Sequence, residues 1–389
     1  MAKTIVILGA SYAGIPIAHY LLKHTTAKVK GLKVIIVAPN THMYWNVAAV
    51  RGILPDMMPD EKLFLPLAPA FSKYPSDQYE FVRGVAENVD ASRNVVEVRG
   101  NDGHTKTIQY DELVIATGSS FKADMPFKNL SSTEKTKDTL HDWSRRIKSA
   151  KSIVVAGAGA TGIEIAGELG QEYAVTGKKQ VILVSDQELP LTSKFTRAVR
   201  ETAKKELERL KVKVITNAKA AASSTSPNTI TLTKPDGTTT SITADLVIPT
   251  YGITPNTSFL PPAMLDSRGF VKQTARLRAE GHDNIFVVGD AGNLEDAQGL
   301  HTDAQVVHVV KFIDARLLGS AEAEAQVPDY KPADKVVLAA SLGKNRGIGQ
   351  VGKMRLWGWL IAWLKGKHLG TNHAAAFVRG ERTLSAKEW

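Results

Sequence analysis

The chain has 389 residues, of which 43% are hydrophobic, and a net charge of +10. This length suits two or three domains with ordinary cores. The chain has no cysteine, which excludes structural disulfides, cysteine-ligated zinc and catalysis by a redox-active thiol pair. No stretch reaches the roughly 20 apolar residues that span a bilayer, and no signal-like segment precedes the first apolar run. We therefore expect a cytoplasmic protein, with peripheral contact to a membrane surface left open.

The N-terminal segment predicts a strand, a tight turn, a helix and a second strand. The apolar run Thr4–Leu8 predicts a buried parallel strand, and Ile15–Lys23 has the character of a helix. The glycine-rich turn Gly9–Gly14 lies between them, where a helix N-terminus offers unpaired N–H groups to a pyrophosphate. Ser11 replaces the usual middle glycine, but its small side chain still permits close approach. The alternative is an ordinary strand–helix turn without a ligand.

The same order of elements recurs from Ser152 to Val184, with a complete G-x-G-x-x-G turn in its middle. In this pattern Gly157 permits the tight turn, Gly159 lets a pyrophosphate approach the backbone, and Gly162 lets the helix pack on the strand. The repeat indicates an internal duplication of a nucleotide-binding unit.

The acidic residue that normally accepts from an adenosine ribose is absent from both units. Asn40 falls at this position in the first unit, and Ser185 falls there in the second. An acidic residue at this position would repel the 2′-phosphate of NADPH. Serine does not, so NADPH is permitted. No arginine stands beside Ser185 in the sequence, so NADPH is not demanded.

Further along, short β-rich runs and a helix starting near Leu300 are expected. The expected strands are residues 229–233, 238–243, 246–249, 285–288 and 336–341. The Ala/Ser-rich stretch Ala218–Ser226 is expected to be a loop. The basic clusters at residues 145–151 and 204–213 are expected to be solvated helix faces.

A set of motifs in a fixed order carries a family resemblance. They are Gly9–Gly14, Asn46–Arg51, Ala116–Gly118, Gly157–Glu164, Tyr251–Asn256, Gly281–Asn284, Val288–Asp290, Gly299–His301 and Ser341–Gln350. As a set they resemble the two-dinucleotide flavoproteins, also called FAD-dependent pyridine nucleotide oxidoreductases. Within that family the chain resembles the apoptosis-inducing-factor-like branch, and most of all its ferroptosis suppressor members.

The resemblance implies an α/β flavoprotein with two Rossmann-like dinucleotide-binding domains and a C-terminal α+β module. The FAD-binding domain would be discontinuous, covering residues 1–120 and 255–330. The NAD(P)H-binding domain would cover 121–254, and the C-terminal module 331–389. The implied cofactors are FAD and either NADH or NADPH.

The resemblance also implies residue roles. The implied cofactor contacts are Gly9, Ser11, Gly14, Asn40, Asn46, Arg51, Thr117, Gly118, Gly157, Gly159, Gly162, Ser185, Gly252, Gly289, Asp290 and His301. Asp290 would bond the ribityl chain of FAD, unless it only caps the end of a strand. Glu164 would lie near the nicotinamide, unless it is only a carboxylate favoured in a first helical turn. Lys365 matches the lysine assigned to quinone reduction, whereas Gly370 stands where the family has an aromatic residue.

The absence of cysteine sharpens the implied activity. Many relatives of this fold pass electrons from flavin to a cysteine pair, but this chain cannot. The expected enzyme is therefore an NAD(P)H:quinone oxidoreductase, in which electrons pass from nicotinamide through flavin to a quinone-type acceptor. Two alternatives stay open: a flavin-bound redox signalling or interaction factor with slow turnover, and an NAD(P)H oxidase that uses oxygen.

The C-terminal segment is basic and rich in tryptophan. From Lys331 onward it has eleven Lys or Arg against three Asp or Glu. The stretch Arg355–Lys365 holds three of the six tryptophans between basic ends, which suits a helix lying at a membrane interface. The alternative is a helix packed in the core. No nucleic-acid module and no metal site is expected, since His301 and His308 lack a third ligand, and an oligomer is left open.

Overall fold

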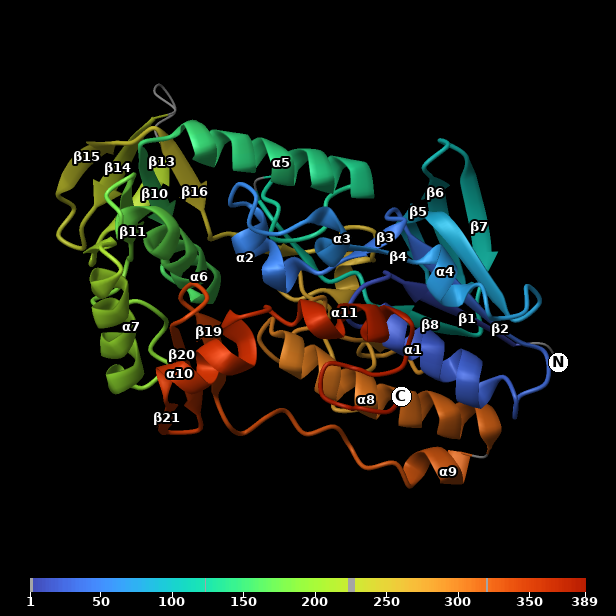
Figure 1. Ribbon diagram of the computed structural model, residues 1–389. Coiled ribbons are helices and arrows are strands. Elements are labelled where there is room, and N and C mark those ends of the chain that lie inside the picture. The colour runs from blue at the N-terminus through green and yellow to red at the C-terminus, as the bar shows by residue number, and fades with distance from the viewer. Residues whose placement is uncertain (1–2, 123, 223–227, 320) are drawn as a thin grey trace.

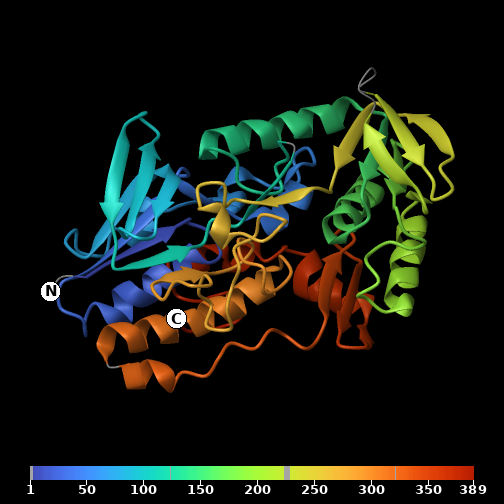
Figure 2. The same ribbon diagram turned by 180° about the vertical axis from the view of Figure 1, so that it is seen from behind.

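The computed structural model describes residues 3–122, 124–222, 228–319 and 321–389. Two lobes lie side by side, and a C-terminal module lies against both of them (Figures 1 and 2). The chain passes between the lobes at a short antiparallel pair, β9 (Ser119–Phe121) with β17 (Ile253–Pro255). The α/β fold class expected from the sequence is confirmed.

The first lobe is built on a seven-stranded sheet of order β18-β8-β1-β2-β5-β6-β7. Its strands are β1 (Lys3–Leu8), β2 (Leu32–Ala38), β5 (Tyr79–Asp90), β6 (Val95–Gly100), β7 (Thr105–Gln109), β8 (Glu112–Ile115) and β18 (Ile285–Val287). The first five in this order are parallel, and β6 and β7 extend the sheet antiparallel. The central strands are buried because elements cover both faces, which explains their nearly continuous apolar sequence.

Helix α1 (Gly14–Tyr20) follows β1 and continues as a π-helical turn over Leu21–Thr25. The helix expected to start near Leu300 is confirmed as the long helix α8 (Gly299–Leu318), which packs beside α1. The smaller elements of this lobe are β3 (His42–Tyr44), a 3₁₀ turn at Asn46–Ala48, α2 (Ala49–Gly52), α3 (Asp60–Leu63), β4 (Phe64–Pro66), α4 (Ala68–Phe71), a 3₁₀ turn at Pro262–Met264 and α9 (Ala321–Ala325).

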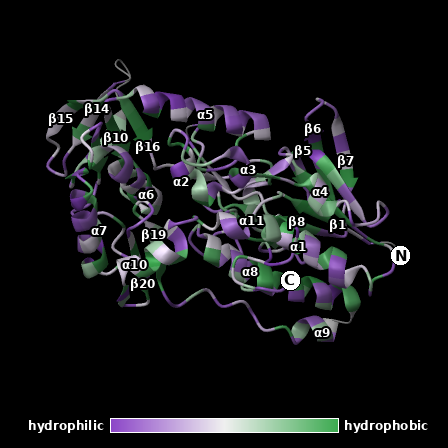
Figure 3. Ribbon diagram, viewed as in Figure 1, coloured by the Kyte–Doolittle hydropathy of each residue, from purple (hydrophilic) through white to green (hydrophobic). Residues whose placement is uncertain are grey.

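The second lobe holds a parallel sheet of order β12-β11-β10-β16. Its strands are β10 (Ser152–Ala156), β11 (Gln180–Val184), β12 (Lys213–Ile215) and β16 (Leu246–Pro249), and its helices are α5 (Thr133–Ser149), α6 (Ala160–Leu169) and α7 (Arg197–Arg209). Like α1, α6 continues as a π-helical turn, over Gly170–Ala174. Helix α5 is mostly hydrophilic, whereas β16 is mostly hydrophobic (Figure 3).

A second, antiparallel sheet in this lobe consists of β13 (Lys219–Ala222), β14 (Thr229–Thr233) and β15 (Thr239–Thr243). The expectation of a loop over Ala218–Ser226 was therefore wrong for Lys219–Ala222, because these residues pair with β14. Residues 223–226 lie outside the described residues.

The C-terminal module combines a three-stranded antiparallel sheet with short helices. The sheet consists of β19 (Val337–Ser341), β20 (Gly347–Val351) and β21 (Met354–Leu356). The expected single helix over Arg355–Lys365 was wrong: the segment ends β21, forms the short helix α10 (Gly358–Ile361) and then a π-helical turn over Ala362–Gly366. Helix α11 (Thr371–Val378) follows. Among the described residues, no helix combines the length and apolar character needed to cross a membrane.

The last residues of the chain return to the first lobe. The buried carboxylate of Asp303 in α8 accepts hydrogen bonds from the backbone N–H groups of Leu384 (2.8 Å) and Ser385 (2.9 Å). The indole of Trp389 donates to the carbonyl of Pro16 in α1 (2.7 Å). These contacts bring Leu384 to the rim of a cavity between the lobes.

Candidate functional site

A cavity of about 310 Å³ lies where the two lobes and the C-terminal module meet. Both glycine turns contribute to its wall, through Ser11 of the first and Thr161 next to the second. The sequence-predicted residues that line it are Ser11, Asn46, Thr117, Gly118, Glu164, Gly289, Asp290 and Lys365. The fold therefore gathers residues from six separate stretches of sequence at one cavity.

The first turn leaves no room for side chains at its two glycines. Gly9 has φ +114°, and a Cβ there would lie 2.3 Å from the carbonyl oxygen of Ala116. A Cβ on Gly14 would lie 1.8 Å from the carbonyl oxygen of Gly9. The helix therefore starts directly against the strand, with its N-terminal N–H groups at the turn, which is the geometry that suits a pyrophosphate.

The second turn repeats this geometry. Gly157 has φ +110°, and a Cβ on Gly162 would lie 1.9 Å from the carbonyl oxygen of Gly157. The hydroxyl of Thr250 donates to that same carbonyl (2.9 Å) and fixes the turn. A Cβ on Gly159 would meet no atom within 4 Å, so the middle of this turn is a bare backbone surface that a phosphate can reach.

Two unpaired polar atoms in the first lobe fit a dinucleotide. The Oδ1 atom of Asn40, just past β2, is buried and has no hydrogen-bond partner among the described residues, while its amide donates to the carbonyl of Leu130 at 3.4 Å. An acceptor at this position suits a ribose hydroxyl, which can donate. The buried hydroxyl of Tyr12 also lacks a hydrogen-bond partner within the ranges that the structure describes, and this side chain lines the cavity. The residues present therefore fit FAD in the first lobe.

Asp290 follows β18 and reaches the cavity. Its carboxylate accepts a hydrogen bond from Ser119 (2.8 Å) and forms an ion pair with Lys128 (2.6 Å). Lys128 was not predicted from the sequence, because the residue belongs to no motif and only the fold brings it to Asp290. Asn256 also lines the cavity and donates to the carbonyl of Thr117 (2.9 Å). The motif Tyr251–Asn256 contained this signal, but its asparagine was not selected.

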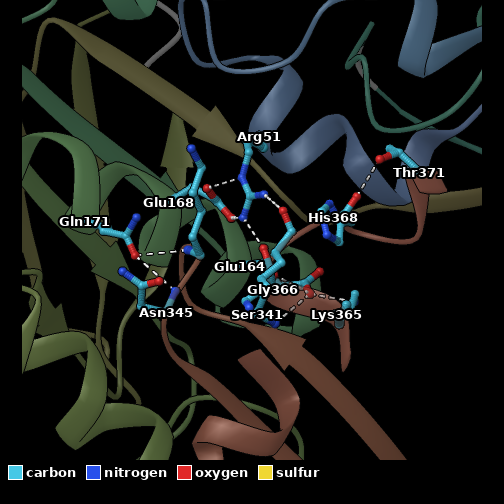
Figure 4. A network of polar contacts seen from close by, with 12 residues as sticks. Arg51, Glu164, Glu168, Gln171, Ser341, Asn345, Lys365, Gly366, His368 and Thr371 are labelled. Atoms are coloured by element: carbon cyan, nitrogen blue, oxygen red, sulfur yellow. Dashed lines mark hydrogen bonds and ion pairs between the residues drawn. The ribbon is translucent and has the colours of Figure 1, made fainter. Parts of the chain in front are cut away.

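The two residues expected to act in catalysis form an ion pair across the domain boundary (Figure 4). Lys365 Nζ lies 2.6 Å from Glu164 Oε1 and donates to the carbonyl of Ala339 at 2.9 Å. The same Oε1 accepts from the backbone N–H of Ser341 at 3.0 Å. Since an ammonium has three donors, one N–H of Lys365 is left beyond these two contacts. Among the described residues, Oε2 of Glu164 makes no hydrogen bond.

Arg51 lies outside the cavity wall. Its guanidinium donates twice to Glu168, from Nε (2.9 Å) and Nη2 (2.7 Å), and both side chains are 1% exposed. It also donates to the carbonyls of Gly366 (2.7 Å) and Lys367 (3.1 Å), immediately after Lys365. The structure thus places Arg51 as a link between α2, α6 and the C-terminal module, and its contact with a cofactor stays a prediction.

Nine other predicted residues also lie away from the cavity wall: Gly9, Gly14, Asn40, Gly157, Gly159, Gly162, Ser185, Gly252 and His301. The buried hydroxyl of Ser185 accepts from the backbone N–H of Gln187 (3.2 Å), within its own loop. Gly252 has φ +83° and packs beside Lys122, and the ring of His301 contacts the carbonyl of Asp296 (3.0 Å). Helix α7 brings Arg200 to the loop after β11, where it donates to Gln187 (2.9 Å). The sequence alone did not place an arginine there.

Among the described residues, no group of three or more His, Asp or Glu side chains has an arrangement that could hold a metal ion. The expected cofactor contacts of the second lobe lie in the loops at the carboxyl ends of β10 and β11 or beside them. They are Gly157, Gly159, Gly162 and Ser185. In open α/β sheets this edge is the ordinary place for a nucleotide.

Comparison with known proteins supports a family assignment. The family model for pyridine nucleotide-disulphide oxidoreductases matches residues 3–305. Oxidoreductase ptaL from Pestalotiopsis fici is 40% identical over 93% of this chain and 95% of that protein. Ferroptosis suppressor protein 1 from Homo sapiens is 25% identical over 90% of this chain and 89% of that protein. The expectation that ferroptosis suppressors are the most similar proteins was therefore wrong, because ptaL is markedly closer.

Solved structures share the fold. The sulfide:quinone oxidoreductase of Aquifex aeolicus has a TM-score of 0.77 and 18% identity, covering 97% of this chain and 92% of its own. NDH2 of Plasmodium falciparum, solved in complex with NADH, has a TM-score of 0.74 and 11% identity, covering 100% and 99%. At these identities the likeness establishes the fold alone.

Proposed function

This chain belongs to the pyridine nucleotide-disulphide oxidoreductase family, and we propose that it is an NAD(P)H:quinone oxidoreductase. The coarser activity, that of an FAD-dependent NAD(P)H oxidoreductase, follows from the family. The finer assignment concerns the acceptor. Although the family is named for disulphide chemistry, the chain has no cysteine, so electrons must leave the flavin for an external acceptor.

The observation that supports a quinone is the Glu164–Lys365 pair on the cavity wall. A quinone takes up two electrons and two protons, and its oxygens become negatively charged as electrons arrive before protons. The remaining N–H of Lys365 can donate to such an oxygen and stabilise the charge. Because Lys365 is already held by Glu164 and Ala339, this donor is oriented before the acceptor arrives.

Bound FAD would take hydride from the nicotinamide and pass two electrons to the acceptor. The chain's own residues supply position and charge. The residues that would hold FAD are Gly9, Ser11, Gly14, Asn40, Asn46, Thr117, Gly118, Gly289 and Asp290. The residues that would hold the pyrophosphate of NAD(P)H are Gly157, Gly159 and Gly162. The carboxylate of Glu164 would face the positive charge that develops on the nicotinamide ring as hydride leaves.

We propose that the protein meets a lipophilic acceptor at a membrane surface. Trp357, Trp359 and Trp363 are each more than 60% exposed, and basic residues surround them. Large exposed apolar patches with a polar rim are typical of interaction surfaces. Tryptophan and basic side chains together favour a lipid interface.

Anaerobic titration of the FAD-loaded protein tests the proposal. NADH or NADPH should bleach the flavin absorbance, and a short-chain ubiquinone or menadione should restore it with one quinone reduced per nicotinamide oxidised. Stoichiometric hydrogen peroxide in air, unaffected by quinone, would instead identify an oxidase. A long-lived bleached state in the presence of quinone would favour a signalling role. An absence of bleaching by either nucleotide contradicts the whole assignment.

A further inference from the structure

A second cavity, of about 460 Å³, lies on the outer side of the C-terminal module, where the module meets α7. Four basic side chains line it: Lys205 and Arg209 from α7, and Arg346 and Arg355 from the module. Its one carboxylate is Glu206, which is paired with Arg346 (2.6 Å) and also with Arg209. We call this cavity the α7 groove.

The positive charge of the α7 groove is only partly balanced. Glu206 offers one negative charge against four positive ones. Among the described residues, no carboxylate pairs with Lys205 or Arg355, and the guanidinium of Arg355 donates instead to the hydroxyl of Thr202 (2.9 Å). Such a groove attracts anions, and arginine side chains in particular bind phosphate through paired N–H donors.

The rim of the same groove is apolar and unusually exposed. Trp357 and Trp359 line the groove and stack on each other, with ring centroids 6.0 Å apart. Five large hydrophobic side chains of the module are the most exposed in the described part of the chain: Met354 (63%), Trp357 (69%), Trp359 (65%), Trp363 (62%) and Leu364 (60%). They follow one another along β21, α10 and the π-helical turn. A soluble surface rarely keeps so much apolar area without a partner.

We propose that the α7 groove binds the phosphate head group of an anionic phospholipid while the five apolar side chains enter the interfacial layer. The inference rests on the proposed membrane-surface role and names the lipid class and the site. A lipid surface fits better than a protein partner because the module presents exposed tryptophans with unbalanced basic groups directly beside them. Tryptophan prefers the head-group level, and basic residues are attracted there by anionic lipids.

The placement has a consequence for the reaction site. Trp363 and Leu364 directly precede Lys365, whose ammonium turns inward to Glu164. The π-helical turn therefore carries the membrane-facing side chains on one side and a cavity-lining residue on the other. Because α7 belongs to the second lobe, lipid binding would involve that lobe as well as the module.

Vesicle binding by the FAD-loaded protein is the test. Co-sedimentation should be strong with vesicles that contain phosphatidylserine, weak with phosphatidylcholine alone, and reduced by salt. Tryptophan emission should shift to shorter wavelength on binding. The double variant Lys205→Ala/Arg209→Ala should lose roughly 30-fold in affinity for anionic vesicles, at about fivefold for each basic residue near the surface. Trp357→Ser/Trp359→Ser should lose much of the emission shift and keep only the part that comes from Trp363.

Matched variants separate this site from general electrostatics. Lys28→Ala/Lys30→Ala removes the same charge from exposed positions in the first lobe, and should leave vesicle binding nearly unchanged. Because Lys205 pairs with no carboxylate in the described part of the chain, Lys205→Ala alone, with about fivefold loss, covers the case in which the double variant is destabilised. Equal losses in both double variants, or equal binding to the two kinds of vesicle, would overturn the proposal.

Two further arms separate the sources of phosphate and the two proposals. If inorganic phosphate at vesicle-equivalent concentration displaces the protein completely, the groove takes free phosphate and the lipid assignment is wrong. Reduction of a water-soluble quinone, measured without vesicles, should be the same in all these variants and the wild type. If the wild-type protein does not reduce the quinone, the proposed function is wrong. If it reduces the quinone but does not bind anionic vesicles, only this inference is wrong.

Discussion

Two carboxylates one turn apart on α6 show how differently the same chemistry can be used. Glu164 lies on the cavity wall and pairs with Lys365, whose side chain is 24% exposed. Glu168 pairs with Arg51, and both of these side chains are 1% exposed. Both pairs join the second lobe to another part of the chain (Figure 4). Only the first leaves donor and acceptor capacity facing a cavity.

We propose that this difference separates a catalytic pair from a structural one. Arg51 uses four of its five N–H donors on Glu168 and on the carbonyls of Gly366 and Lys367, and its side chain is buried away from the cavity wall. Burial raises the pKa of Glu168, while the bidentate arginine opposes that rise. A buried pair adds little net stability but is costly to break. We call Arg51–Glu168 the inner pair and Glu164–Lys365 the outer pair. We therefore expect the inner pair to control the stability of the fold and the outer pair to control the reaction.

The largest effect should come from breaking the inner pair. Arg51→Met leaves the carboxylate of Glu168 buried without its partner and should reduce the free energy of unfolding by about 3 to 5 kcal/mol. Urea denaturation measures the loss. Arg51→Met/Glu168→Leu removes both charges and should recover much of it. If the double variant is no more stable than the single one, the loss comes from the freed carbonyls of Gly366 and Lys367 instead.

Removing the ammonium of the outer pair should affect chemistry more than stability. Lys365→Met takes away the donor to the acceptor oxygen and should slow flavin reoxidation by quinone by roughly a hundredfold. Flavin reduction by NAD(P)H should change much less. Stopped-flow absorbance measures the two half-reactions separately. Lys365→Arg keeps the charge and should restore part of the rate; an equal loss in both half-reactions would remove the assigned role.

Neutralising the carboxylate of the outer pair should shift the effect to the other half-reaction. Glu164→Gln keeps an oxygen for the backbone N–H of Ser341 but removes the negative charge that we propose faces the nicotinamide. Flavin reduction should slow by about tenfold. As a matched control on the inner pair, Glu168→Gln should leave the reduction rate of the folded protein nearly unchanged. A larger effect from Glu168→Gln would reverse the comparison.

Much of this arrangement was predictable from the sequence, because local rules decide it. The glycine turns at Gly9 and Gly157 and their flanking strands follow from glycine's positive φ and from apolar runs. Pairings between distant segments were not predictable. Lys128 reaches Asp290 over 162 residues and Arg51 reaches Glu168 over 117, and neither has a local signal. The tryptophan segment was expected as one helix, but the glycine at 358 and the sheet contacts of β21 divide it.

The smallest effect should come from a third buried ionisable group, His19, whose pKa is lowered mainly by burial and further by the nearby charges of Lys73 and Lys23. Its ring stacks on Phe71, contacts the hydroxyl of Tyr74 (2.7 Å) and lies 2.8 Å from the carbonyl of Val378. Burial lowers the pKa of His19 from 6.5 to about 3, so the folded protein keeps the ring neutral.

The unfolded chain takes up a proton below pH 6.5, and the folded chain does so only near pH 3. Stability is therefore full above pH 6.5 and falls as the pH drops toward 3, by about 1 kcal/mol between pH 7 and 5.5. Urea midpoints over this range, compared with those of His19→Gln, measure the term; a variant with the same pH slope as the wild type would show that burial of His19 is not its source.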